Sequence, residues 1–68
     1  MNKKQEILDE TLKNLKKYGY NGWSFRDIAN ELGIKHTSIH YYFPTKDNLV
    51  EKVLENYIED FFQIPTRN

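Results

Sequence analysis

The 68-residue chain contains no cysteine, no internal repeat and no hydrophobic run long enough for a signal peptide or a membrane span. Without cysteine, a disulfide framework and cysteine-based zinc sites are excluded, and a reducing compartment is the natural expectation. Residues 1–6 lead directly into a charged amphipathic segment. We therefore expect a soluble, cytoplasmic protein with no membrane partner.

A chain of this length has room for one domain with a thin core and little space for a buried active site. Hydrophobic residues make up 38% of it and aromatic residues 15%, which is too apolar for a disordered segment. Ser24, Asp27 and His36 are scattered along a surface without a pocket, so no enzyme is expected. His36 and His40 have a spacing that metals use, but no cysteine or well-placed carboxylate completes a site. Neither a metal nor a cofactor is therefore expected.

Ten basic and ten acidic residues cancel, which argues against a nucleic-acid-binding protein if only the total is considered. The distribution argues the other way. Residues 33–46 contain basic side chains and no acid, whereas the acidic residues collect in residues 51–60. One end of the molecule can therefore attract phosphate while the other end repels it.

Hydrophobic spacing predicts four helices and no strand, hence an all-α fold. The first runs from about residue 4 to 18 and stops at Gly19. A capping box of Ser24 and Asp27 starts the second, which ends at Gly33. The third spans 35–43, with Ile39 and Phe43 facing the core. The fourth spans about 45–62, capped by Thr45.

The aromatic side chains are expected mainly in the core, because so small a domain needs its rings for burial. This expectation covers Tyr18, Tyr20, Trp23 and Phe25. The fourth helix is longer than the three short helices can cover, at 1.5 Å per residue. Its far end should therefore be exposed in this chain and pack on another domain; the residues concerned are Tyr57, Ile58, Phe61 and Phe62.

The second and third helices are joined by the tight turn Leu32-Gly33-Ile34, a geometry that lets the third helix project into a DNA major groove. Any small helical bundle contains such a corner, so the spacing alone also allows a protein interaction module. A steep loss of DNA affinity with salt would favour DNA, and insensitivity to salt would favour a protein partner.

Several motifs together resemble the DNA-binding head of the TetR/AcrR family of transcriptional regulators. The similarity runs from about Ile7 to Val53 and rests on Gly19-Tyr20, residues 23–29, Leu32-Gly33-Ile34, residues 38–43 and residues 46–49. Three positions depart from the usual family pattern: Lys35 where a serine cap is common, His40 where tyrosine is common, and Trp23 where a small residue is common. These departures affect the individual contacts and not the family.

The resemblance implies a homeodomain-like small helical bundle, in which a three-helix head with a helix-turn-helix is followed by a connecting helix. It implies sequence-specific binding of double-stranded operator DNA by a repressor that a small-molecule inducer releases. Family members carry a larger C-terminal domain that binds the inducer and forms the homodimer. We expect residues 1–68 to be the DNA-binding domain alone, without that C-terminal domain.

Chemistry and resemblance together give a set of candidate DNA contacts. His36 and Thr37 lie where family members contact base edges, with a solvated face as the alternative. Arg26 matches a position that reaches guanine in some members, and an ion pair with Asp27 or Asp47 is its alternative. Lys35 lacks the acceptor of a good helix cap, so a contact with DNA or sequence drift explains it. Ser38 is a further candidate DNA contact. The remaining candidates are expected to contact mainly phosphates, with Tyr42 alternatively in the core: Ser24, His40, Tyr41, Tyr42 and Lys46.

Overall fold

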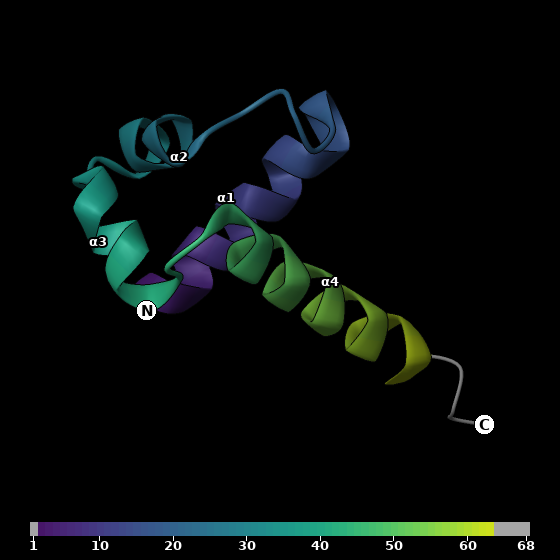
Figure 1. Ribbon diagram of the computed structural model, residues 1–68. Helices are drawn as coiled ribbons and strands as arrows, with labels where there is room; N and C mark the ends of the chain where they lie inside the picture. The colour runs from purple at the N-terminus through teal and green to yellow at the C-terminus, as the bar shows by residue number, and fades with distance from the viewer. Residues whose placement is uncertain (1, 64–68) are drawn as a thin grey trace.

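The computed structural model describes the backbone of residues 2–63 and the side chains as far as Ile58. Within these limits the chain forms four helices and no strand, which confirms the all-α prediction (Figure 1). The helices are α1 (Lys3–Tyr18), α2 (Phe25–Leu32), α3 (His36–Tyr42) and α4 (Lys46–Gln63). Helix α1 packs against both α2 and α4, and α2 packs against α3.

Each helix begins or ends where local chemistry requires it. Asn2 caps α1 by accepting the Lys4 amide at 2.8 Å, and Thr45 caps α4 by accepting the Asn48 amide at 3.1 Å. The predicted capping box of α2 is present. Gly33 ends α2 with φ 69°, a left-handed conformation that costs an L side chain about 1 kcal/mol or more. The Ile34 amide then returns to the Ala29 carbonyl at 3.0 Å and closes the turn.

The core is a single cluster to which all four helices contribute. Its fully buried members include Ile7 from α1, Ile28 from α2, Ile39 from α3 and Leu49 from α4. Trp23 and Phe25, at the entrance to α2, complete this cluster, which confirms the prediction that their rings are buried. Because every helix supplies part of one small core, no helix can shift without exposing apolar surface.

The prediction that Tyr18 and Tyr20 are buried is wrong, since their exposed fractions are 53% and 43%. Tyr18 is the last residue of α1, and Tyr20 lies in the loop before α2. A tyrosine can cover an apolar surface with its ring and keep its hydroxyl in water, so burial was not required of either residue. The core is completed by Trp23 instead.

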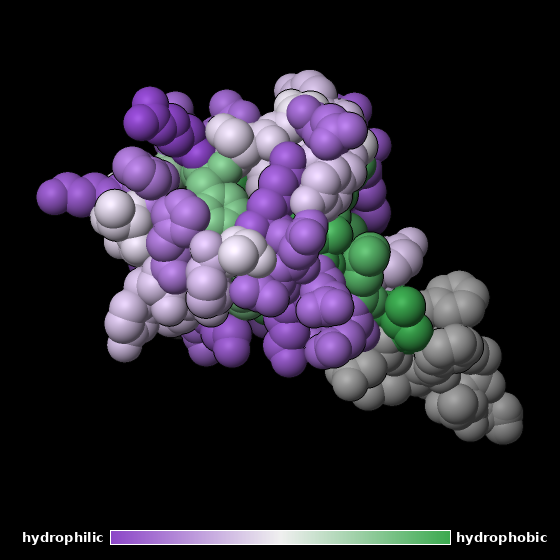
Figure 2. All heavy atoms as spheres, viewed as in Figure 1, coloured by the Kyte–Doolittle hydropathy of each residue, from purple (hydrophilic) through white to green (hydrophobic). Residues whose placement is uncertain are grey.

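The far half of α4 extends beyond the bundle, as the length of its apolar stripe predicts. Tyr57 and Ile58 are 47% and 49% exposed. Figure 2 shows hydrophobic surface along α4 up to the part drawn in grey. The side chains of Phe61 and Phe62, for which the same exposure is expected, lie outside the described residues.

Thr11 is a polar residue buried inside the core. Its side chain is completely buried, and its Oγ1 has no hydrogen-bond partner among the residues that the structure describes. A buried hydroxyl without a partner costs about 1–3 kcal/mol of desolvation. The Thr11→Val variant keeps the shape and removes the hydroxyl, so we expect the free energy of unfolding to rise by about 1 kcal/mol.

Urea denaturation followed by circular dichroism measures this change. Thr45→Val is the matched control, because there the lost hydroxyl caps α4 and the free energy of unfolding should fall by about 1 kcal/mol. If Thr11→Val were destabilising as well, the Thr11 hydroxyl would have a partner in solution.

Candidate nucleic-acid interface

The corner between α2 and α3 holds an open groove of about 500 Å³. No acidic side chain contributes to the lining of this groove, and two cationic side chains do. The lining residues are Arg26, Ala29, Asn30, Ile34, Lys35, His36 and Thr37. The structure therefore brings four of the ten predicted site residues together around one concave surface.

Arg26 and Lys35 supply the positive charge of this groove. Both side chains are exposed, and neither forms an ion pair with another residue in the described part of the chain. The alternative role of Arg26, a pair with Asp27 or Asp47, is thus not found there. Both cations are available to an anionic ligand.

Lys35 precedes α3 with extended backbone angles and makes no side-chain capping bond. This confirms that it is a poor cap for a helix that serine would cap better. The Ser38 amide donates to the Lys35 carbonyl at 3.0 Å, so one amide of the first turn is satisfied by the backbone itself. Ser38 is only half-exposed, whereas Thr37 beside it is exposed on the groove.

His40 is held from two sides. Its ring lies 4.5 Å from that of Phe25, centroid to centroid, and its Nδ1 lies 3.2 Å from the Pro44 carbonyl oxygen. A carbonyl oxygen only accepts, so Nδ1 carries the hydrogen in this contact and Nε2 is an acceptor in the neutral ring. His40 can donate from Nε2 to a phosphate only when the ring is protonated.

The two tyrosines at the end of α3 differ in exposure. Tyr41 is 84% exposed, whereas Tyr42 is 38% exposed. Their rings meet edge to face at 5.3 Å, and the Tyr42 ring also lies 6.5 Å from that of Phe43. Tyr41 therefore presents its whole ring and hydroxyl to a ligand, while Tyr42 supports it from the edge of the core.

Ser24 and Lys46 already use part of their hydrogen-bonding capacity within the protein. The Ser24 hydroxyl and backbone amide both donate to the Asp27 carboxylate, at 3.2 and 2.8 Å. The Lys46 ammonium donates to the Trp23 carbonyl at 2.7 Å. An ammonium has three donors, so Lys46 retains others for a ligand, whereas a serine has a single hydroxyl hydrogen.

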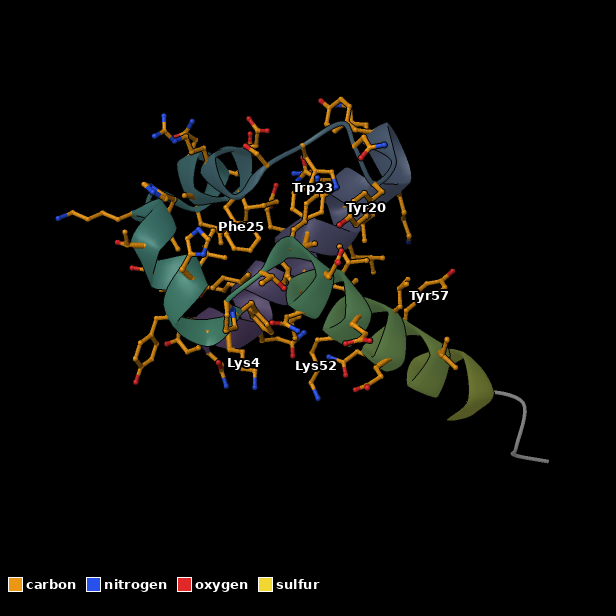
Figure 3. All side chains as sticks on the ribbon, in the orientation of Figure 1. Lys4, Tyr20, Trp23, Phe25, Lys52 and Tyr57 are labelled. Atoms are coloured by element: carbon orange, nitrogen blue, oxygen red, sulfur yellow. The ribbon has the colours of Figure 1, made fainter. Side chains whose placement is uncertain are left out.

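Lys4 is a cation near the interface that the sequence analysis did not select. Its ammonium lies 5.8 Å from the centre of the Phe43 ring, at the end of α3, and Figure 3 shows it below that helix. In the sequence it is one of two lysines at the start of α1, far from residues 35–43. Only the folding of α1 under α3 brings it to this side, so no local pattern could have identified it.

His36 and His40 approach each other with ring centroids 6.0 Å apart. Among the side chains that the structure describes, no group of three or more His, Cys, Asp and Glu is placed to hold a metal ion. None of the helices in the described range combines the length and the apolar composition needed to cross a membrane.

Comparison with known proteins matches residues 7–53 to the model of the family described as "Bacterial regulatory proteins, tetR family". This match confirms the resemblance inferred from the sequence, with the same boundaries. No solved structure matches the chain.

Three curated relatives are all transcriptional regulators. The chain is 29% identical over 65 residues to the biofilm operon icaADBC HTH-type negative transcriptional regulator IcaR of Staphylococcus epidermidis, covering 96% of this chain and 35% of the relative. It is 35% identical over 60 residues to the uncharacterized HTH-type transcriptional regulator YvaF of Bacillus subtilis, covering 88% and 31%. It is 33% identical over 57 residues to the HTH-type transcriptional regulator RutR of Escherichia coli, covering 84% and 27%. The chain thus spans about a third of the length of these relatives.

Proposed function

Because this chain belongs to the tetR family of bacterial regulatory proteins, we propose that it is the operator-binding head of a cytoplasmic transcriptional repressor and has no enzymatic activity. The observation that carries the proposal is the groove between α2 and α3, where Arg26, Lys35, His36 and Thr37 converge without an acidic residue. A projecting helix flanked by cations fits the major groove of duplex DNA and its phosphates.

Within this site we divide the residues by the part of DNA that they contact. His36 and Thr37, on the first turn of α3, contact base edges, and Arg26 reaches a guanine from the start of α2. Phosphate contacts come from both sides of α3. Lys35 supplies them at one end of the helix, and Tyr41 supplies them at the other. The remaining phosphate contacts are those of Ser24, Ser38, His40, Tyr42 and Lys46, together with Lys4.

Repression is proposed because the relative from S. epidermidis is a negative regulator. We further propose that the regulator acts as a homodimer whose two heads meet successive major grooves, about 34 Å apart. The exposed residues Tyr57 and Ile58 of α4 would contact a C-terminal regulatory domain. A small inducer bound in that domain would tilt α4 and separate the heads from this spacing.

We expect the 68-residue chain to bind duplex DNA weakly and with strong salt dependence, because a single head contacts few phosphates. Fluorescence anisotropy with a labelled duplex pool at two salt concentrations measures this binding. Absence of binding at low salt would contradict the proposed function, and salt-insensitive binding to a protein partner would favour an interaction module instead.

The division between base and phosphate contacts predicts two kinds of variant. His36→Ala and Thr37→Ala should change which sequences are selected from a random duplex pool, with a loss of about 1–3 kcal/mol at the preferred site. Lys35→Gln and Lys4→Gln should weaken binding to all sequences alike and lower the slope of log affinity against log salt by about 1.

Lys46 is unsuited to this comparison, because its ammonium also holds the Trp23 carbonyl. Lys13→Gln serves as the control, since Lys13 is paired with Glu10 on α1 and lines no part of the groove. The division is wrong if His36→Ala, like Lys35→Gln, weakens binding to every sequence equally.

A further inference from the structure

The loop before α2 and the start of α4 are joined by two hydrogen bonds and two cation–π contacts. The Tyr20 hydroxyl donates a hydrogen bond to the Asp47 carboxylate. The Lys46 ammonium donates to the Trp23 carbonyl and lies 4.6 Å from the centre of the Tyr20 ring and 4.4 Å from that of Trp23. Figure 3 shows both rings between the loop and the first turn of α4. We call these four residues, Tyr20, Trp23, Lys46 and Asp47, the clasp.

Tyr20 lies outside the core, and its structural role is to contact Lys46 and Asp47 in the clasp. Trp23 is buried, whereas the Tyr20 ring is exposed and closes the ammonium in from outside. An ammonium between two aromatic faces is attracted by both ring quadrupoles, most strongly by tryptophan. The hydrogen bond to Asp47 raises the pKa of Tyr20 above its ordinary value, which is the direction expected when the hydroxyl donates to a carboxylate.

The clasp adds a direct connection between the loop before α2 and the start of α4. The principal helix contacts are those of α1 with α2, α1 with α4 and α2 with α3. The clasp instead connects the first two residues of α4 to the loop that ends at Ser24, the N-cap of α2. Gly22 lets this loop lie close on α1, because a Cβ there would come within 2.5 Å of the Tyr18 carbonyl oxygen. The start of α2 is thus fixed from both sides.

We propose that Tyr20 and Asp47 are positioning residues for DNA binding: by closing the clasp, they set the start of α2, and with it Arg26, relative to α4. This inference rests on the proposed function. Neither residue lines the groove, and neither has to touch DNA. They act through the orientation of the helix that carries Arg26 and packs against α3.

The Asp47→Ala variant tests the proposal, because electrostatics alone and an open clasp predict opposite changes in DNA affinity. Removing an acid from a DNA-binding domain should raise its affinity if only long-range electrostatics matters. Opening the clasp should instead lower the affinity, by about threefold to tenfold for the loss of one hydrogen bond. Glu51→Ala is the matched control, since Glu51 is an exposed acid one turn further along α4. The DNA affinity of the Glu51→Ala variant should be unchanged or slightly raised.

Tyr20→Phe removes only the hydroxyl and leaves the ring over Lys46. We expect a similar loss of affinity, with an unchanged salt slope because no phosphate contact is removed. Tyr18→Phe is the control, an exposed tyrosine two residues away whose hydroxyl makes no hydrogen bond to another described residue. In the double variant Tyr20→Phe/Asp47→Ala the loss should not exceed that of the larger single loss, because both changes open the same contact.

The measurement is the dissociation constant and salt slope of the folded 68-residue chain on its selected duplex, with the emission of Trp23, the single tryptophan, reporting the clasp. Both clasp variants should change this emission, and Tyr18→Phe should not. Leu12→Ala controls for stability, because it weakens packing on α1 away from the groove. Equal affinity losses for Leu12→Ala and the clasp variants would overturn the proposal, as would clasp variants that bind like the wild type.

These outcomes are distinct from failure of the proposed function. If the unaltered chain binds no duplex at low salt, the proposed function and the positioning role are both wrong. If it binds and the Tyr20 and Asp47 variants bind equally well, the positioning role alone is wrong.

Discussion

The left-handed turn at Gly33 is the constraint on which the rest of the structure depends. It ends α2 after eight residues and directs the chain so that Ile39 of α3 and Phe43, just after α3, join Ile28 in the core. Once those side chains are buried, the opposite face of α3 has to point outward. The groove that carries Lys35 and Arg26 is therefore a consequence of how the turn and the core fit together.

Features encoded within one or two helical turns could be predicted from the sequence. The helices, the capping box of Ser24 and Asp27, the poor cap at Lys35 and the burial of Ile39 all follow from spacing and local chemistry. The burial of Tyr18 and Tyr20 was predicted wrongly, because a tyrosine is equally suited to the core and to its edge. For Tyr20 the deciding contact is the one with Asp47 of α4, 27 residues away, and such a long-range contact cannot be read from local spacing.

In the candidate site, too, the residues near in sequence could be predicted, whereas the contacts between distant residues could not. Arg26, Lys35, His36 and Thr37 are near in sequence, and the structure brings them together. The contact of Lys46 with Trp23 spans 23 residues, and that of Tyr20 with Asp47 spans 27. A pattern can nominate a lysine for phosphate, but it cannot tell whether the ammonium is already partly committed to a carbonyl and two rings.

The zero net charge of the chain is compatible with an anionic ligand because the charges are paired unevenly. On α1, Glu6 pairs with Lys3 and Glu10 with Lys13, each at 3.6 Å. Asp27 and Asp47 are occupied by internal donors: Asp27 accepts from Ser24, and Asp47 accepts from Tyr20. These two acids therefore contribute to the fold through internal contacts, while Arg26 and Lys35 form no ion pair among the described residues. The local field around the groove follows from that division and not from the total charge.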